Sequence, residues 1–573
     1  MRSTLVIAYL SAFLCSDSYS QNPLFIPDTL SGTTFNIAVQ SGTTTFFAGH
    51  NTPTYGYNGN LLGPTLLMNK GDSVTLNVTN NLAVPTTVHW HGFHLPAKYD
   101  GGPHQIIDPG KTWSPSFKVR NEASTFWYHP HGNMKTEVQV TKGLAGMIII
   151  RDSTEATYAL PRRYKLDDFP LIVQSKGLDV LYQFTTGYHR DTVLMVNGTI
   201  DPYLQVPKQV VRFRLLNGSA DRTYYFGLSD SSDMHLISSD GGLLSQQITT
   251  KRVRLSSGER AEILIDFGAD TVGQQKYLMS FASELPHGII GADSVGTNTI
   301  VLGDGYYTNP LNGADFNLLR FDVVSTTANP VTTIPASFTP VVPIPTASAT
   351  VTRKLIFFPD TGFAGQQGFV EGPFFINNRL FNMDSINQVV YLNDVEIWTL
   401  INQTLVAHPF HIHDIQFFVV DINGTPPPPQ YSGLKDVMLV MPNDTVRFIT
   451  RFSDFADDSV PFMYHCHLLH HEDEGMMGTF IVIDTTNTSV YENILPKYIS
   501  IYPNPSSGKI HAQFERSDIY NTFVYNTMGE CVQKSIFSGQ TLNLDTGSYP
   551  NGMYYLRVQS RKGSYYSKII VQR

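Results

Sequence analysis

Residues 464–476 read Tyr464-His465-Cys466-His467-Leu468-Leu469-His470-His471-Glu472-Asp473-Glu474-Gly475-Met476. A blue-copper electron-transfer site takes one Cys thiolate, two imidazoles and a weak axial Met. Cys466, His471 and Met476 supply all of that set except one His. Successive side chains of a strand point to opposite faces, so Cys466 would bind a metal on one side while its two His neighbours face the other side. The pattern therefore predicts two copper centres joined by one short stretch of backbone.

Three further segments of the chain carry a His-x-His step. They are His89-Trp90-His91, His129-Pro130-His131 and His408-Pro409-Phe410-His411-Ile412-His413. A spacing of two residues puts both imidazoles of a pair on one face of a strand. His408 completes the blue-copper set with Cys466, His471 and Met476, which leaves eight imidazoles for a cluster of three more copper ions. Zinc is the main competitor for imidazoles, but structural zinc prefers closed Cys/His sets, and this chain has too few thiols.

These four segments resemble the four copper motifs of the multicopper oxidases, in the order of that family. The resemblance includes Asp100-Gly101-Gly102-Pro103, Gly143-Leu144-Ala145-Gly146-Met147 and the final H-C-H-x3-H-x4-M spacing. It implies that His89 and His411 bind the type 2 copper. It assigns the type 3 pair to His91, His129, His131, His413, His465 and His467. The axial Met476 is similar to that of three-domain bacterial laccases, cuprous oxidases and spore-coat oxidases.

The resemblance implies an oxidase with four copper ions per chain. A reducing substrate would give single electrons to a type 1 copper, and a trinuclear cluster would reduce O2 to water. Glu472 and Asp100 become candidate proton donors, and the alternative for both is to orient imidazoles by hydrogen bonds. The chain has 15 Met but no Met-rich insertion before the third domain, which favours phenols or aromatic amines as substrates.

Three other functions are alternatives to this oxidase. A cuprous or metal-ion oxidase in copper tolerance would share all the ligands. A non-catalytic, copper-binding electron carrier would need only the blue-copper set, so the eight additional histidines count against it. A two-domain copper nitrite reductase would have no use for paired histidines around the Cys. Uptake of O2 with a phenolic donor distinguishes an oxidase from a carrier.

The composition favours an all-β chain of three cupredoxin-like Greek-key β-sandwich domains plus a small C-terminal β-sandwich. Gly (44), Pro (34), Tyr (29) and Phe (35) are abundant, and long helical periodicity is missing. Expected boundaries are 22–155, 165–322 and 353–487 for the three domains, with a Thr/Pro-rich linker at 323–352. Short β-like runs occur at Ser73–Asn77, Met147–Ile150, Val210–Leu216 and Ala261–Phe267. Because the middle domain has no His-x-His, the eight imidazoles must meet where the first and third domains touch.

The two ends of the chain carry export signals. Residues 1–20 are typical of a secretory signal peptide, with a short basic start, an apolar core and small residues before Gln21. Residues 497–573 resemble the C-terminal sorting domain of type IX secretion cargo, and a carbohydrate-binding or adhesive appendage is the alternative. We therefore expect a secreted or cell-surface protein that meets the type IX secretion machinery. After loss of Cys15 only Cys466 and Cys531 remain, so no disulfide is needed.

The remaining sequence features limit the partners. A net charge of -9 supplies no basic stripe, which argues against nucleic-acid binding. We expect a monomer that uses O2 and a small-molecule or metal-ion reductant. The other histidines are expected on the surface or behind the ligands, and among them His94 and His104 lie nearest the first pair.

Overall fold

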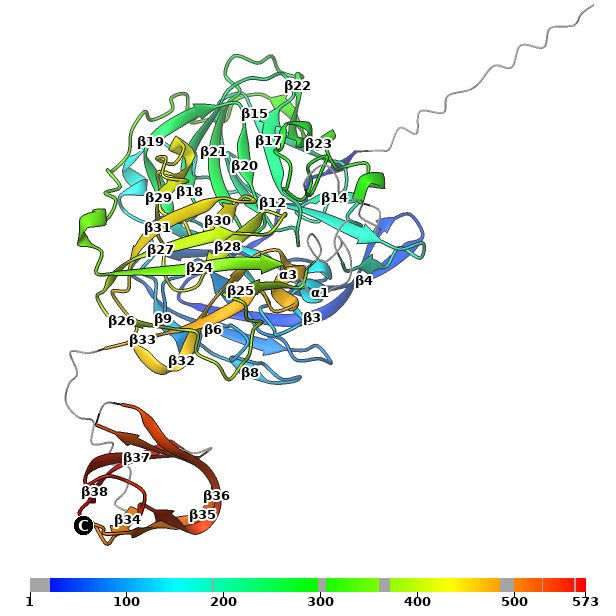
Figure 1. The fold of residues 1–573 in the computed structure, drawn as a ribbon. Coiled ribbons are helices and arrows are strands. Elements are labelled where there is room, and N and C mark those ends of the chain that lie inside the picture. Colours follow the sequence, from blue (N-terminus) through cyan, green and yellow to red (C-terminus); the bar gives the residue numbers. More distant parts are fainter. Residues whose placement is uncertain are drawn as a thin grey trace, which may run out of the picture. The chain divides into compact units, whose positions relative to one another are not determined.

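The structure is a computed structural model that describes residues 21–187, 190–296, 306–359, 372–484, 499–527, 529–560 and 563–573. The expected signal peptide at residues 1–20 lies outside these described residues. The chain divides into two compact units at the Asp484/Thr485 boundary. Strands dominate both units, which confirms the expected all-β class (Figure 1). Over the described ranges, no helix has the length and apolar character needed to span a bilayer.

The first domain is a sandwich of two sheets. One sheet has the order β2-β5-β11-β10-β7, formed by Thr29–Ser31, Thr65–Asn69, Gly146–Arg151, Ser124–His129 and His89–His91. The other has the order β4-β3-β6-β8, formed by His50–Tyr57, Thr34–Phe47, Ser73–Asn80 and Thr112–Trp113, and β9 (Ser116–Lys118) also pairs with β6. Val74, Leu76 and Val78 alternate with more exposed residues along β6 and pack into the core between the sheets.

The middle domain also consists of two packed sheets. The first has the order β1-β15-β23-β22-β17-β20, formed by Asn22–Pro23, Pro202–Pro207, Asp315–Val324, Gln275–Phe281, Tyr224–Leu228 and Val253–Leu255. The second has the order β13-β12-β16-β21-β18-β19, formed by Phe184–Thr185, Asp168–Leu178, Val210–Asn217, Arg260–Asp266, Met234–Ser239 and Gly242–Thr250, and β14 (Val193–Val196) pairs with β12. β16 and β21 are buried over nearly their full length because the first domain covers their outer face.

The third domain repeats the two-sheet arrangement. Its outer sheet has the order β25-β24-β27-β31-β29, formed by Phe374–Ile376, Val351–Pro359, Val395–Asn402, Thr445–Arg451 and Phe418–Ile422. Its inner sheet has the order β26-β33-β32-β28-β30, formed by Gln388–Tyr391, Met477–Ile483, Asp457–Cys466, His408–Ile412 and Val437–Val440. Trp398, Phe448 and Phe480 fill the space between the sheets.

Helices in the described residues are short. The α-helices are α1 (Thr136–Thr141) and α3 (Leu469–Asp473), and the 3-10 turns are η1 (Ala97–Tyr99), η2 (Glu155–Thr157), η3 (Ala282–Glu284), η4 (Tyr306–Thr308), η5 (Thr346–Ser348) and η6 (Pro429–Tyr431). The expected linker at 323–352 overlaps β23 and β24 at its two ends and contains no strand between them. Its centre is attached to the middle domain, where Phe338 is buried and its N–H donates to the Ser245 carbonyl at 2.9 Å.

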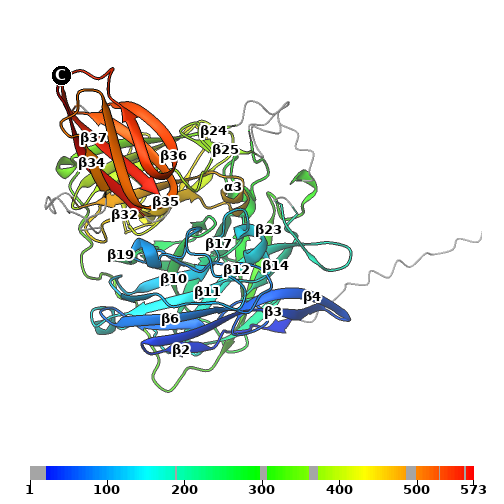
Figure 2. The same cartoon turned by 90° about the horizontal axis from the view of Figure 1, so that it is seen from below.

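The first and middle domains share an apolar interface. Trp127, Met147 and Ile149 from β10 and β11 pack against Ile172 and Leu216 of β12 and β16. Figure 2 shows β10 and β11 lying between the outer sheet of the first domain and β12. The histidine strand β10 is therefore held from both sides.

The C-terminal unit forms a small β-domain, as the sequence predicts. Its sheet has the order β34-β35-β37-β38, formed by Ile499–Tyr502, Lys509–Asn526, Gly552–Ser560 and Gly563–Val571, and β36 (Cys531–Asp545) pairs with β35. A separate core of residues such as Ile510, Val524 and Leu556 lies within this unit. The unit therefore has its own apolar core.

Candidate metal centres

Paired strands deliver the predicted ligands to two places. In the first domain β7 and β10 are antiparallel neighbours, so that His89 lies opposite His129. In the third domain β28 and β32 are antiparallel neighbours, with His411 opposite His465 and Phe410 opposite Cys466. Because the period of a strand is two, His465 faces the histidine side while Cys466 faces the core of its own domain.

Cys466 lies at the centre of the first group. Its Sγ is 3.4 Å from His408 Nδ1 and 3.7 Å from His471 Nδ1, and all three side chains are buried. The Met476 side chain is fully buried in the same apolar core, and its carbonyl accepts the N–H of Cys466 at 3.0 Å. The ring of Phe374 from β25 packs edge-on against both imidazoles, at 4.7 Å and 4.5 Å between centroids. The structure therefore brings His408, Cys466 and His471 together inside the third domain, and Met476 lies in the same apolar core.

The remaining eight imidazoles form one cluster between the first and third domains. Each is at most 1% exposed. Donor atoms lie within 4.8 Å of one another in three overlapping groups: His89, His411 and His413; His89, His91 and His129; His131, His413 and His465. His467 joins the second group, with its ring centroid 4.9 Å from that of His91. The structure thus brings together all eight histidines that the sequence singles out.

The protonation of these groups suits a metal site. Burial lowers the pKa of His91, His129, His131, His411, His413 and His467 well below the ordinary value, and neighbouring imidazoles lower each pKa further. Burial also lowers the pKa of His408 to about 3. Neutral imidazoles can coordinate a metal. The Nε2 atoms of His89, His411 and His467 are buried and have no protein partner, which is costly unless they bind a cation.

The donor set fits copper better than zinc. One thiolate, two imidazoles and a thioether make a blue-copper site, and a cluster of neutral imidazoles suits copper ions. Burial raises the pKa of the Cys466 thiol well above its ordinary value, so a bound cation has to displace that proton.

Two carboxylates hold imidazoles of the cluster from behind. Glu472 Oε1 lies 3.2 Å from His131 Nδ1, and its Oε2 lies 3.2 Å from His465 Nδ1. Asp100 Oδ2 lies 2.6 Å from His413 Nδ1, and the Asp100 carbonyl lies 2.9 Å from His89 Nδ1. His465 Nδ1 also lies 3.0 Å from the Cys466 carbonyl. Because a carboxylate or carbonyl oxygen only accepts, the Nδ1 atoms of His89, His413 and His465 carry the proton, and their Nε2 atoms are left to bind a metal.

Close packing requires a glycine at position 101, directly after Asp100. Its φ is +80°, and a Cβ built there would lie 1.7 Å from the carbonyl oxygen of Val88. Only glycine allows this approach to the strand that carries His89. Asp100 is thereby held against the His89 and His413 rings.

Other histidines near the motifs do not join the cluster. His94 Nε2 lies 3.0 Å from Asp454 Oδ2, and its Nδ1 lies 3.0 Å from Asp414 Oδ1. His104 Nε2 is 3.1 Å from the Met383 carbonyl. His470 lies between Glu137 and Glu474.

Sequence reasoning missed three contributors to these sites. They are Phe374 beside the Cys466 group, Thr404, whose Oγ1 is 2.8 Å from His408 Nε2, and Asp436, whose carbonyl is 2.8 Å from His411 Nδ1. Thr404 lies four residues before His408, a weak signal. Phe374 and Asp436 lie far in sequence from the rings they touch, so no local spacing could identify them.

Comparison with known families gives four matches along the chain. Residues 38–155, 191–306 and 354–486 match families described as "Multicopper oxidase". Residues 500–572 match the family described as "Secretion system C-terminal sorting domain".

Individual relatives cover most of the first unit. "Multicopper oxidase mco" of Staphylococcus haemolyticus is 33% identical over 454 residues, which is 78% of this chain and 87% of the relative. "Cell division protein FtsP" of Sodalis glossinidius is 32% identical over 76% of this chain and 87% of its own length.

Solved structures share the arrangement of the first unit. A bacterial laccase-like multicopper oxidase, CueO of Ochrobactrum sp., has a TM-score of 0.70 and 31% identity, covering 80% of this chain and 100% of the other. McoA of Aquifex aeolicus has a TM-score of 0.71 and 30% identity, covering 81% and 100%.

Proposed function

We propose that this protein, which belongs to the multicopper oxidase family, binds four copper ions and couples one-electron oxidation of a reducing substrate to the reduction of O2 to water. The single observation that carries the proposal is the position of Cys466. Its side chain lies beside His408 and His471, while its two neighbours in sequence, His465 and His467, belong to the eight-histidine cluster. One residue therefore links both centres covalently.

The ligand assignment follows the two groups. His408, Cys466, His471 and Met476 would hold the type 1 copper. His89 and His411, whose Nε2 atoms have no protein partner, would hold the type 2 copper. His91, His129, His131, His413, His465 and His467 would hold the type 3 pair. When bound, copper would supply single-electron acceptance at the Cys466 centre and electron delivery to O2 at the cluster.

The protein itself supplies a short connection and a dry enclosure. The backbone of Cys466 runs directly into both neighbouring histidines, and its carbonyl accepts from His465 Nδ1 at 3.0 Å. The buried eight-histidine site keeps its ligand atoms away from bulk water. Burial strengthens the electrostatic interactions inside the site.

Glu472 and Asp100 are proposed to hold and deliver protons at the cluster. Each carboxylate lies beside the Nδ1 atoms of two ligand imidazoles, and both carboxylates are buried. The same contacts give both residues an orienting role, because they fix the tautomer and tilt of each ring. The two roles predict different effects of replacing Glu472 by Gln.

Phenols or aromatic amines are the proposed electron donors. The structure of the Ochrobactrum relative is described as having oxidase activity towards lignin model compounds and lignosulfonate. In this chain the buried Phe374 ring packs against His408 and His471 of the Cys466 group. The alternative is a metal-ion oxidase: a Campylobacter jejuni protein of the same fold is described as a metallo-oxidase.

Steady-state kinetics separate these substrates. A phenol, an aromatic diamine and Cu(I) are compared with the copper-loaded protein. The proposal predicts a higher kcat/KM for the phenol and the diamine than for Cu(I). A preference for Cu(I) would assign the protein to metal-ion oxidation instead.

A non-catalytic copper carrier is the second candidate. The chain is also similar to a protein named for cell division, a name that states no oxidase activity. A carrier would accept electrons without consuming O2, whereas an oxidase consumes O2 in proportion to the substrate oxidised.

The C-terminal unit is proposed to direct export. It belongs to the sorting-domain family, and it has its own core. We propose that the signal peptide directs passage through the inner membrane and that the type IX machinery carries the protein through the outer membrane. The exported protein would be secreted or held at the cell surface, as a monomer.

A further inference from the structure

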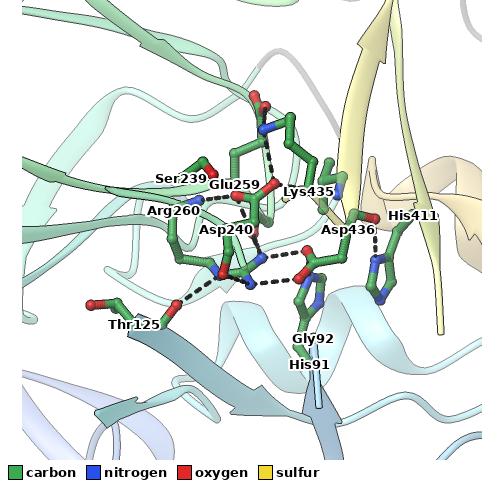
Figure 3. Close-up of polar contacts among 12 residues, drawn as sticks. His91, Gly92, Thr125, Ser239, Asp240, Glu259, Arg260, His411, Lys435 and Asp436 are labelled. Carbon is green, nitrogen blue, oxygen red and sulfur yellow. Dashed lines mark hydrogen bonds and ion pairs between the residues drawn. The ribbon is translucent and has the colours of Figure 1, made fainter. Parts of the chain in front are cut away.

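A group of five buried ionic side chains lies beside the histidine cluster, where all three domains meet. Its members, here called the Asp436 cluster, are Asp240, Glu259, Arg260, Lys435 and Asp436 (Figure 3). Each of these side chains is at most 3% exposed. Burying charges is unfavourable unless each one is paired and hydrogen-bonded. A group of this size away from solvent therefore calls for a function or for complete pairing.

The pairing within the group is nearly complete. Arg260 donates from Nη1 to Asp436 Oδ1 at 2.5 Å and from Nη2 to Oδ2 at 2.7 Å. Lys435 lies 2.8 Å from both Asp240 Oδ2 and Glu259 Oε1. Burial alone would lower the pKa of Arg260, but Asp436 and Asp240 raise it above its ordinary value. The guanidinium therefore stays charged, and it holds Asp436 at two points.

Asp436 contacts one histidine from the first domain and one from its own domain. Its Oδ1 lies 3.3 Å from His91 Nε2, and its carbonyl oxygen lies 2.8 Å from His411 Nδ1. Both oxygens only accept, so His91 carries its proton on Nε2 and presents Nδ1 to the cluster. His91 Nδ1 is indeed the atom that lies 3.3 Å from His129 Nε2. His91 thus has the tautomer opposite to that of His413 and His465.

The middle domain also contacts His467, through the turn at residues 256–260 that carries Arg260. Ser257 Oγ donates to the Ser219 carbonyl at 2.6 Å and lies 3.2 Å from His467 Nδ1, from which it can accept. At Gly258, with φ of +85°, a Cβ would lie about 3 Å from three atoms of the His467 ring. The turn at residues 256–260 therefore packs directly on His467, whose Nε2 has no protein partner.

Gly92 shows how tightly this contact is built. Its φ is +82°, and a Cβ there would lie 2.5 Å from Asp436 Oδ2 and 2.7 Å from Arg260 Nη2. Any side chain directly after His91 would push the Arg260–Asp436 pair away. Because glycine has no side chain, the Arg260–Asp436 pair can lie against the backbone next to His91.

The three donors His91, His411 and Asp436 also lie close enough together to hold an ion. The atoms next to Asp436 already have protein partners: Arg260 donates to both Asp436 carboxylate oxygens, His91 Nε2 lies beside Oδ1, and His411 Nδ1 donates to the Asp436 carbonyl. The arrangement is that of a support behind the ligands, not of an additional metal site.

We propose that the copper-free middle domain positions His91 and His467, two of the ligands assigned to the type 3 pair, through Arg260 acting on Asp436 and through Ser257 and Gly258 acting on His467. This inference rests on the proposed function. It gives the middle domain a role in setting the geometry of the cluster, and it makes Asp436 and Arg260 positioning residues. The group has three anions and two cations, so its net negative charge partly neutralises the positive charge of bound copper ions.

Asp436→Asn is the principal test, and Asp168→Asn is its matched control. Asp168 is also fully buried and held at two points by an arginine, Arg214, at 2.7 Å and 3.0 Å, but its partners are arginines and not histidines. Copper per chain is measured during dialysis against a chelator, together with the type 2 electron paramagnetic resonance spectrum, the blue absorption, and the melting temperature of both apo-proteins.

Asp436→Asn should keep the blue absorption while cluster copper binds about 10- to 100-fold more weakly and the type 2 spectrum changes. Asp168→Asn should lower the apo-protein melting temperature but keep wild-type copper affinity and spectrum. Wild-type cluster affinity and spectrum in Asp436→Asn would overturn the inference, as would equal copper loss in both variants.

Ser257→Ala covers the case in which Asp436→Asn does not fold. It removes only the hydroxyl beside His467 Nδ1 and changes no charge, and it should weaken cluster copper in the same direction. Wild-type affinity in this variant would contradict the role of the 256–260 turn. If the wild-type protein itself bound no copper at the cluster, the proposed function would fail instead, which separates the two results.

Discussion

Replacing Glu472 by Gln separates the proton-donating role of this residue from its orienting role. In the wild type its two oxygens lie 3.2 Å from Nδ1 of His131 and of His465. Glutamine has one oxygen and one NH2 group, so it can accept from only one ring. His465 has a second acceptor, the Cys466 carbonyl at 3.0 Å, so the Gln oxygen should turn toward His131. Both rings then keep an acceptor.

The expected magnitudes follow from this geometry. Loss of orientation should be small, because no imidazole N–H is left unpaired, and copper affinity should fall by less than the roughly 10- to 100-fold typical for removing such a partner. Loss of a general acid costs about 10²–10⁴-fold in the step that needs the proton. A large rate loss with retained copper therefore identifies the proton role.

The assay is stopped-flow reoxidation of the fully reduced variant by O2, with reduction of the blue absorption by substrate followed separately. Reduction should stay fast while reoxidation slows. Asp473→Asn is the matched control, because this neighbouring carboxylate accepts the N–H groups of Thr136 and Glu137 at 2.9 Å and touches no proposed ligand. An unchanged reoxidation rate in Glu472→Gln would refute the proton-donor role and leave orientation alone.

Three further predictions concern the tail, the Asp100 turn and pH. A protein ending near residue 490 should fold, bind four coppers and turn over normally yet fail to reach the outer surface of its own host; copper loss from the purified truncation would show a structural role for the tail. Gly101→Ala should cost about 1–3 kcal/mol of backbone strain and lose cluster copper, whereas Gly110→Ala, with a similar φ of +74° but open space around it, should keep copper; equal copper contents would contradict the packing argument. Burial opposes the charge on His94, but Asp414 and Asp454 raise its pKa from 6.5 to about 9, so its stabilisation is present below pH 6.5 and is lost as the pH rises through 9; the melting-temperature difference between wild type and His94→Gln should shrink over that range, and a constant difference would exclude the pairing.

The sequence predicts much of the fold because strand period and ligand spacing are local properties. Alternation along residues 73–80 marks a half-buried strand, and the two-residue steps place each histidine pair on one face. The order of the four segments along the chain also requires the first and third domains to meet. These inferences need no knowledge of how distant strands pair.

The supporting contacts could not be predicted in this way. The register that sets His411 opposite His465 arises from tertiary pairing. Asp436 and Arg260 are 176 positions apart and act together only after the domains dock. The choice of Nδ1 or Nε2 in each imidazole depends on those contacts, since an acceptor at one nitrogen leaves the other for the metal.

The contact between the linker and the middle domain could not be predicted from the composition of the linker either. A run rich in Thr and Pro indicates a spacer. Burial of Phe338 and its pairing with Ser245 show that one aromatic residue and one backbone hydrogen bond attach it to the middle domain.

The ratio of donor oxidised to O2 consumed, measured in an oxygen electrode for the wild type beside Cys466→Ser, tests the coupling of the two centres most directly. Four one-electron oxidations per O2 are expected in the wild type, because reducing O2 to two waters takes four electrons. Cys466→Ser should lose the blue colour and this turnover while the histidine cluster still binds copper, since the thiolate is both a ligand and the covalent link to His465 and His467. Donor oxidation without O2 uptake in the wild type, or undiminished turnover in a colourless Cys466→Ser protein, would contradict the account.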